Sequence, residues 1–493
     1  EGEYFMSEFS QLLSDYIHNK DIRIYSLAEY CGIDRSLMYK IIHGKRTPAS
    51  LKTVDKIADY LRLTPGESRE LTETYCILQQ GRDNFYRRKD MLNFLNNFRN
   101  IANAGGFLPE KADSPQYLRE TEALSSESEV NQAVFNIIMQ QLRKQGGRID
   151  MLISPDYSFL INLLATAGQP DCPAEINHII CLNNSEQIDA DKKNYNLHCL
   201  MNILPLCSSG CRYRPRYYYD NIASRLDTFR LFPFMILTDD SAVLLSETLR
   251  EGLFTSQPDL LGLFNTIYRQ YTQLSRPLLQ KIDSAYEQLR YIQEFIAEDS
   301  PAEYSFQMTP CMTYLLTDDF LEKYVNPDLP AREQFIRNLR EHIKITHDRY
   351  QAAEQTIIFS EEGLADFLDT GMIEEYPVDI YNRPLTEDRI KLVQCFIEEC
   401  RKHFRHFRML RHSIGTVRNG ANIYITEKSG YLLFTPVGGR QPICLDIRES
   451  GLLSAFWDFF ENMDENLFYP PDEALARMEI LVQRYEETYK QTC

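Results

Sequence analysis

The chain has 493 residues, of which 43% are hydrophobic and 12% aromatic, which suits roughly two to four packed domains and excludes an intrinsically disordered protein. Its net charge of −18 shows that acidic side chains outnumber basic ones. No run approaches the roughly 18 apolar residues that cross a bilayer, and we expect no leader, because the first residues do not show a basic segment followed by an apolar one. We therefore expect a cytoplasmic protein with no membrane partner, and we expect the residues before Met6 to be a remnant of expression or processing.

The N-terminal residues show the pattern of two helices joined by a tight turn. Apolar spacing predicts a first helix from Ser7 to Asn19. Within residues 26–48, a short apolar helix is followed by Gly32, which can adopt a positive φ, and by Asp34, a typical N-cap residue. The next helix is predicted to end near Gly44. At least part of its apolar set must turn inward: Leu37, Met38, Ile41 and Ile42.

The order L-A-x-x-x-G-I-x-x-S, continued by G-K-R-x-P and an apolar helix at 51–61, resembles the Cro and lambda-repressor-like (Xre) helix-turn-helix family across residues 7–75. In that family the second helix of the pair lies in the DNA major groove. The resemblance implies an all-α, five-helix DNA-binding domain over residues 1–78. It assigns base or phosphate contacts to seven residues: Arg35, Ser36, Tyr39, Lys40, Lys45, Arg46 and Thr47.

Two residues depart from the family pattern. Ile24 stands where the family often has Gln, and Ile42 stands where it often has Glu. Charge supports DNA binding, because residues 31–62 carry seven Lys or Arg against three acidic residues. The charges of residues 1–90 sum to zero, so the whole net negative charge of the chain lies on residues 91–493. The alternative is a helical bundle that uses the same turn for packing or for docking a protein, as in some antitoxins.

Residues 79–126 are predicted to be a helical linker, with one amphipathic helix near 85–98 that ends before Gly105 and Gly106. Beyond it, helix and strand patterns alternate, which predicts an α/β body with a mixed sheet. We expect a first half at 127–298, connecting helices at 299–351 and a second half at 352–493.

The two halves of the body are predicted to be copies of one α/β unit, spanning about 127–275 and 352–465. Several segments of similar pattern recur in the same order. The matched pairs are 238–245 with 426–433, 260–264 with 452–456, 151–154 with 357–360, 178–182 with 378–381, and the helix at 190–207 with that at 386–403. A chance match of ordinary elements is the alternative.

Duplicated α/β halves resemble the plan of the phospholipase D superfamily, whose signature is His-x-Lys-x4-Asp. The only His-x-Lys here begins at His342 on a predicted helix, and Asp348 lies one place too early. Phosphate-binding loops, nucleophile elbows and zinc-protease motifs are also missing from the sequence. The expectation is a phospholipase-D-like fold without its active site, and not an enzyme.

Cysteines and basic clusters are the remaining candidates for a site in the body. Twelve cysteines are scattered, which predicts reduced thiols, and the close pair Cys207 and Cys211 is only a weak zinc pattern, so no metal and no cofactor is predicted. Two arginine-rich segments are candidates for an anion-binding site, and if the repeat is real both could face a shared cleft; the other interpretation is two solvated edges that balance nearby acidic residues. Their residues are Arg212, Arg214, Arg216, Arg405, Arg408 and Arg411.

Together these patterns predict a sequence-specific transcription regulator that binds operator DNA as a homodimer. The body would bind a small-molecule or peptide effector, dimerise, or do both, and would change DNA affinity by a population shift. The alternatives are a phosphate- or nucleotide-processing enzyme with a DNA-targeting head, and the protein-docking bundle. The residues do not indicate the operator, the effector, or activation versus repression.

Overall fold

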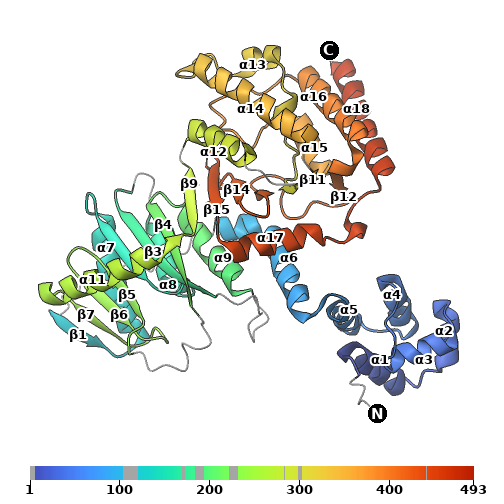
Figure 1. Ribbon diagram of the computed structural model, residues 1–493, viewed down its shortest axis with the longest axis horizontal. Coiled ribbons are helices and arrows are strands. Elements are labelled where there is room, and N and C mark those ends of the chain that lie inside the picture. Colours follow the sequence, from blue (N-terminus) through green and yellow to red (C-terminus); the bar gives the residue numbers. More distant parts are fainter. Residues whose placement is uncertain are drawn as a thin grey trace. The chain divides into compact units, whose positions relative to one another are not determined.

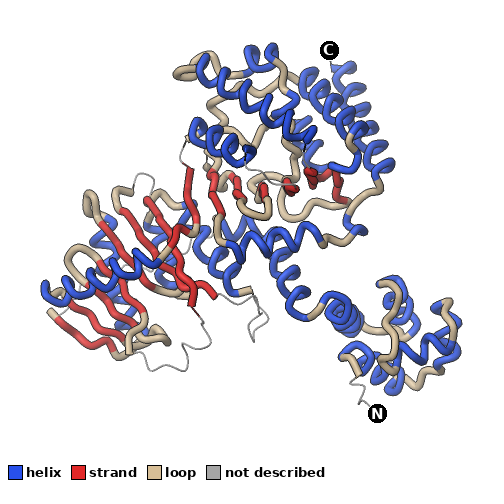
Figure 2. Tube along the Cα trace, in the orientation of Figure 1, coloured by secondary structure: helices blue, strands red, loops and turns tan. Residues whose placement is uncertain are grey.

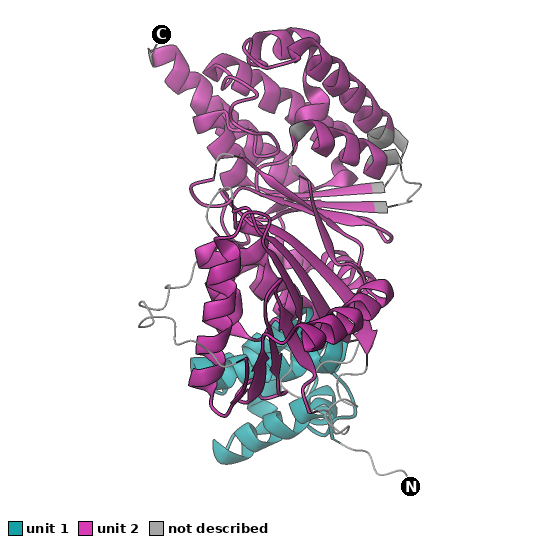
Figure 3. Ribbon diagram, turned by 90° about the vertical axis from the view of Figure 1, so that its left-hand side faces the viewer, with its two compact units in different colours: residues 1–89, 187–194 teal, residues 90–186, 195–493 magenta. Residues whose placement is uncertain are grey.

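The computed structural model describes residues 6–103, 120–168, 172–183, 194–220, 231–282, 284–297, 302–352, 354–439 and 441–492. Its chain divides into two compact units, coloured separately in Figure 3. Unit one comprises residues 1–89 and 187–194, and unit two comprises residues 90–186 and 195–493. Figures 1 and 2 show that unit one is helical and that unit two contains all the strands of the described chain.

Unit one is a five-helix bundle, extended by the start of a sixth helix. Its helices are α1 (Glu8–Asn19), α2 (Ile24–Cys31), α3 (Arg35–Ile42), α4 (Leu51–Tyr60) and α5 (Pro65–Gln80). The Ser7 hydroxyl caps α1 by accepting from the Ser10 amide, and Thr64 and Glu67 form a reciprocal capping box at α5. Ser50 occupies the N-cap position of α4, but its hydroxyl makes no cap hydrogen bond.

Helix α6 (Arg82–Ala102) begins in unit one and ends in unit two. It contains the amphipathic helix predicted near 85–98. In unit two, Phe94 packs edge-on against Phe456, with ring centroids 5.9 Å apart, and Phe98 packs against Phe434 at 5.1 Å. Both α6 rings are buried, so the end of this helix is part of the hydrophobic core of unit two.

The first α/β half of unit two is built on an eight-stranded sheet in the order β1-β7-β6-β5-β2-β3-β4-β8. The strands are β1 (Thr121–Leu124), β2 (Arg148–Leu152), β3 (Glu175–Asn183), β4 (Arg212–Asp220), β5 (Phe234–Leu237), β6 (Ala242–Leu245), β7 (Gly252–Thr255) and β8 (Arg276–Pro277). The helices are α7 (Glu127–Leu142), α8 (Ser158–Ala167), α9 (Tyr195–Ser208) and α11 (Pro258–Leu274). Helix α11 covers one face, and α7, α8 and α9 cover the other (Figure 1).

The second half is built on a seven-stranded sheet in the order β12-β11-β10-β13-β14-β15-β9. The strands are β9 (Leu279–Ile282), β10 (Ala302–Phe306), β11 (Glu354–Ser360), β12 (Phe407–Leu410), β13 (Asn422–Ile425), β14 (Gly430–Phe434) and β15 (Ile443–Ile447). The helices are α12 (Ala285–Ala297), α13 (Asp318–Tyr324), α14 (Arg332–Ala352), α15 (Glu361–Thr370), α16 (Thr386–Lys402), α17 (Ser450–Glu461) and α18 (Pro471–Thr492), with short 3-10 turns at Thr313–Leu315, Phe404–His406 and Glu465–Leu467.

The two sheets repeat one topology. Read from β9 to β12, the second sheet has the order of β1 to β4 in the first, with β15, β14, β13, β10 and β11 in the places of β7, β6, β5, β2 and β3. The directions also agree, because only the β2-β3-β4 and β10-β11-β12 pairs are parallel. The predicted match of 238–245 with 426–433 is a structural equivalence: the Thr238 and Thr426 hydroxyls donate to the Ser241 and Ser429 carbonyls, each at 3.1 Å.

Other parts of the predicted repeat were wrong. The second copy begins at β9, not at residue 352. The segment 357–360 lies in β11, which corresponds to β3 and not to β2. The segment 378–381 is not a strand, since Tyr381 makes only an isolated bridge with Val325. Periodicity cannot distinguish neighbouring buried strands from one another, because their side chains alternate in the same way.

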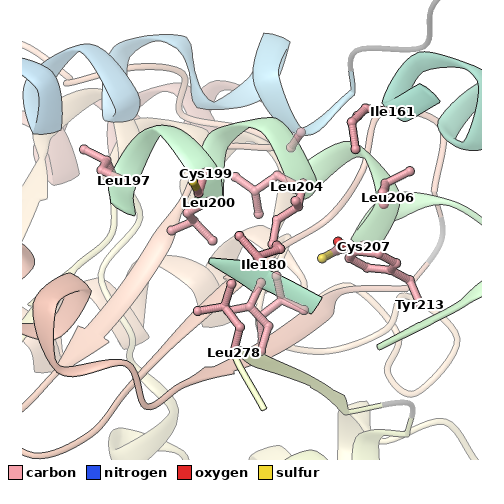
Figure 4. Close-up of a cluster of buried hydrophobic side chains, with 14 of the residues drawn as sticks. Ile161, Ile180, Leu197, Cys199, Leu200, Leu204, Leu206, Cys207, Tyr213 and Leu278 are labelled. Carbon is pink, nitrogen blue, oxygen red and sulfur yellow. The ribbon is translucent and has the colours of Figure 1, made fainter. Parts of the chain in front are cut away.

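The two halves meet where residues 276–282 pass from one sheet to the other. Strand β8 pairs with β4, β9 pairs with β15, and the Leu278 amide donates to the Pro215 carbonyl between them at 3.0 Å. Leu278 lies in the cluster shown in Figure 4, with side chains from α9 and β3. The core is thus continuous across the two halves.

Burial of His178 on β3 predicts a pH-dependent stability. Its ring nitrogens lie 2.8 Å from the Tyr213 hydroxyl and 3.0 Å from the Ile153 carbonyl, and burial lowers its pKa from 6.5 to about 4. The unfolded chain therefore binds more protons between these values, so stability falls as pH drops from 6.5 towards 4. We expect His178 to contribute up to about 1.4 kcal/mol of loss per pH unit in this window.

Urea unfolding between pH 7 and 5 would measure this effect. The slope of unfolding free energy against pH should be smaller in His178→Gln than in the parent protein. His347→Gln is the matched control, because the His347 side chain is 55% exposed, and it should leave the slope unchanged. Equal slopes in all three proteins would contradict the prediction.

Candidate nucleic-acid interface

The turn between α2 and α3 has the geometry of a helix-turn-helix. Gly32 ends α2 in the left-handed conformation with φ of 72°, which a residue without a Cβ adopts at little cost. The Asp34 carboxylate accepts from the Ser36 amide at 2.7 Å and so caps α3, as predicted. On α3, Met38, Ile41 and Ile42 are buried, whereas Leu37 is exposed.

The opposite side of α3 faces solvent. Every residue assigned from the family resemblance to base or phosphate contacts is exposed: Arg35, Ser36, Tyr39, Lys40, Lys45, Arg46 and Thr47. We call these seven residues the α3 surface. None of its four cations forms an ion pair within the part of the chain that the structure describes. The Tyr39 ring stacks on His43 with centroids 3.9 Å apart, which orients both rings.

Backbone hydrogen bonds hold the loop after α3. The amides of Lys45 and Arg46 both donate to the Lys40 carbonyl, at 2.8 and 3.2 Å. The Tyr75 hydroxyl on α5 donates to the carbonyl of the buried Pro48 at 3.3 Å. The side chains of Lys45 and Arg46 are therefore exposed on an ordered loop, and their placement requires little further ordering on binding.

The two departures from the family pattern have structural explanations. Ile42 is 3% exposed and fills the core, where a Glu would be an unpaired buried charge. Ile24 packs partly buried against the same core. Sequence reasoning missed Arg23, which is exposed at the N-cap of α2 without a capping hydrogen bond. The sequence did contain a signal for Arg23, because a basic residue at the start of a helix is unfavourable next to the positive end of the helix dipole and so suggests a role other than stabilising the helix.

The arginines of the predicted anion cleft are mostly engaged in internal contacts. Arg214 pairs with Glu175 at 2.8 Å. Arg216 donates to the Ser275 hydroxyl and to two carbonyls at the end of α11, and Arg408 pairs with Glu465 at 2.7 Å. Arg411 and Arg405 lie over the rings of Tyr469 and Phe404. Arg212 is exposed and has no ion pair with a described residue.

A cleft shared by both arginine clusters was a wrong prediction. Arg212, Arg214 and Arg216 do lie on β4, and Arg408 on its counterpart β12, as the repeat implied. However, β4 lies at the side of the first sheet that meets β9, whereas β12 is the opposite edge strand of the second sheet. The repeat is therefore arranged head to tail, and equivalent strands do not face each other.

The other sequence candidates lie in the protein interior. Cys207 is buried in the core, which raises its thiol pKa to about 12, and Cys211 is buried nearby. Within the described ranges, no group of three or more His, Cys, Asp or Glu side chains could hold a metal ion. His342 lies on α14, a helix as predicted, and is buried. No helix in the described part of the chain is long and apolar enough to cross a membrane.

Comparison with known proteins gives one family match, for unit one. Residues 13–68 match the model of the Cro/C1-type HTH DNA-binding domain. No protein with a curated description matches the sequence.

Three solved structures are similar to long stretches of the chain at low identity and low TM-score. Phosphatidylserine synthase from Haemophilus influenzae is 12% identical, with 82% of this chain and 98% of that chain covered and a TM-score of 0.23. The archaeal chromatin protein TrmBL2 is 10% identical, with 54% of this chain and 99% of that chain covered and a TM-score of 0.22. Polyphosphate kinase from Porphyromonas gingivalis is 11% identical, with 77% of this chain and 60% of that chain covered and a TM-score of 0.22. The family assignment therefore concerns residues 13–68, which are similar to a Cro/C1-type helix-turn-helix DNA-binding domain and support a DNA-binding regulator.

Proposed function

We propose that this protein is a sequence-specific DNA-binding transcription regulator. The observation that carries the proposal is the α3 surface, where four cations and one tyrosine are exposed on a capped helix and the loop that follows it. Elsewhere in the described chain many exposed cations are paired with carboxylates, as Lys144 is with Asp239 and Asp240. Unpaired cations on a rigid convex element suit a polyanion with a groove.

In the proposed complex α3 enters the major groove of double-stranded DNA. Arg35 and Lys40 meet base edges or adjacent phosphates, and Ser36 and Tyr39 lie between them on the same side of the helix. Lys45, Arg46 and Thr47 contact the phosphate backbone from the loop. Arg23 supplies a further phosphate contact at the start of α2, next to Ile24, which stands where the family often has Gln.

The α/β body is proposed to regulate this binding. One helix-turn-helix contacts about half an operator, so a homodimer would place two α3 surfaces on adjacent turns of DNA. The repeated sheets suit a phospholipase-D-like fold that binds an effector without catalysis. Helix α6 links the units covalently, so a change in the core around Phe94 and Phe98 can reach the DNA-binding unit through one continuous helix.

Gel-shift titration of the purified full chain against its own promoter region tests the proposal. We expect a saturable complex that survives excess unrelated DNA, and affinity that falls steeply with salt. Equal affinity for promoter and unrelated DNA would reject sequence specificity. Absence of any complex at low salt would leave the helical bundle as a protein-docking domain and reject the DNA-binding assignment.

Lys45 provides a quantitative test of the phosphate contacts. Lys45→Ala is expected to reduce the slope of log affinity against log salt by about one, because one fewer counterion is released on binding. Fluorescence anisotropy with labelled promoter DNA at several salt concentrations would measure it. Lys144→Ala removes the same charge from an ion-paired residue of unit two and should leave the slope unchanged. An unchanged slope in Lys45→Ala would remove Lys45 from the interface.

A further inference from the structure

A cavity with several polar lining residues lies inside the second α/β half. It has a volume of about 70 Å3 and lies between the face of the second sheet and helices α12 and α14. Since about 10–15 Å3 of such volume holds one water molecule, it has room for about five water-sized groups. Its polar lining includes Glu303, Ser305, Gln355, Tyr424, Tyr431 and His342.

The first half provides an internal reference for this cavity, because strand pairing gives each position its counterpart. The equivalent hairpins make Ile236 the counterpart of Tyr424, and pairing across the sheet then relates Met151 to Ser305. The remaining pairs follow from the same registers. They are Ile149 with Glu303, Ile176 with Gln355, and Val243 with Tyr431.

In the first half all five positions carry apolar side chains that are fully buried and form an ordinary hydrophobic core. In the second half the same positions carry a carboxylate, a hydroxyl, an amide and two phenols, and all five remain buried. Burying polar groups costs free energy unless each finds a partner. One copy of the repeat therefore has an apolar core at these positions, and the other has polar side chains there.

Two polar atoms of the residues that line this cavity have no hydrogen-bond partner among the described residues. One is Nδ1 of His342, a residue that is 5% exposed and lines the cavity from α14. The other is Oε1 of Glu375, which is enclosed although the residue as a whole is half-buried. Each unmet group carries the free-energy cost of its desolvation without the gain of a hydrogen bond. A ligand that supplies the missing partners would recover this cost.

The charge and the aromatic rings of the lining indicate the class of ligand. Glu303 and Glu375 are its ionisable acids, and no Lys or Arg is among the described lining residues. The Glu303 carboxylate accepts from Gln355 at 3.1 Å. Burial raises the pKa of the Glu375 carboxyl because it disfavours the charged form, and a cation bound beside it would favour that charged form again. Tyr424 and Tyr431 stack with centroids 4.5 Å apart at the cavity wall. A lining that contains acidic side chains and tyrosine rings, and no described Lys or Arg, favours a cation.

We propose that the second half binds a small organic ammonium compound in this cavity. The ammonium group pairs with the carboxylates of Glu303 and Glu375, the Tyr424 and Tyr431 rings contact its carbon atoms, and His342 Nδ1 hydrogen-bonds to a polar substituent. This site gives the proposed regulator its effector. Only the effect of the ligand on DNA rests on the proposed function, because binding itself is measured without DNA.

Isothermal titration and thermal unfolding of the full chain, without DNA, test the site. The probes are ethanolamine, choline and 1,4-diaminobutane, with ethylene glycol and acetate as the neutral and anionic comparisons. At least one ammonium compound should bind with one site per chain and raise the unfolding temperature in a saturable way. The proposal is overturned if no ammonium compound binds at millimolar concentration, or if the neutral or anionic probe binds equally well.

Two cavity variants and one control locate the binding. Glu375→Gln should weaken binding of the ammonium compound about tenfold or more, because a charge-assisted contact is lost. Ser305→Met introduces the residue of the first half, fills the cavity without leaving an unpaired charge, and should abolish binding in a folded protein. Glu333→Gln is the control, since that α14 carboxylate is 89% exposed, and it should bind as the parent does. Unchanged affinity in both cavity variants would place the ligand elsewhere and overturn the proposal.

Discussion

Replacing Arg35 and Lys40 together with alanine is expected to weaken binding to promoter DNA by about 100-fold or more, since each lost base or phosphate contact costs about 1–3 kcal/mol. The fold should not change, because both side chains are exposed and neither pairs with a described residue. Affinity should fall for the specific site more than for unrelated DNA if either residue reads a base edge.

Anisotropy titrations of the parent and the double variant at one salt concentration would measure this loss. Arg250→Ala combined with Arg337→Ala is the matched control, because it removes the same charge from two exposed arginines of unit two. The control should bind DNA as the parent does. If the α3 double variant also binds as the parent does, the α3 surface is not the DNA-binding surface.

Replacing Glu449 with alanine is expected to destabilise unit two by about 3 kcal/mol, the sum of a lost cap and of buried donors left unpaired. Glu449 is fully buried and caps α17, where its carboxylate accepts from the amides of Gly451 at 2.9 Å and Leu452 at 2.6 Å. The Tyr219 hydroxyl of the first half also donates to it, so one side chain ties both halves to the start of α17.

Urea unfolding followed by tryptophan fluorescence would measure the change, because the single tryptophan, Trp457, lies on α17 itself. Asp464→Ala is the matched control, since Asp464 also caps a helical turn through its carboxylate but is exposed. It should cost less than about 1 kcal/mol. A similar small cost for Glu449→Ala would show that the buried carboxylate contributes little to the junction of the halves.

The local elements of the DNA-binding unit followed from the sequence because their signals are local. Gly32 and Asp34 determine the turn and the cap within a few residues, and the 3.6-residue period separates Met38 and Ile41 from Arg35 and Lys40. The hairpin at Thr238 and its repeat at Thr426 were found for the same reason, because each turn is held by contacts three residues apart.

The order of strands and the contents of the core depended on contacts between residues far apart in the chain. Strand β9 pairs with β15 across more than one hundred and fifty residues, so residues 279–282 gave no local sign of being a strand. The same limit explains why the predicted shared cleft was wrong, because the sequence cannot show that β4 lies at the side of the first sheet next to β9 and that β12 is the opposite edge strand of the second sheet. Polar residues such as Ser305 and Gln355 resembled ordinary surface positions until the sheet placed them under α12 and α14.

By itself, then, the sequence determined the helices, turns and exposed cations of the first unit and the alternation of helix and strand in the second, because these depend on propensity and on periods of two to four residues. Only the tertiary structure decided which strands are copies of each other, which arginines are already paired, and that one copy has a cavity lined by polar side chains. Those properties arise from pairing between distant strands, and the two-residue period of one strand does not identify the strand that pairs with it.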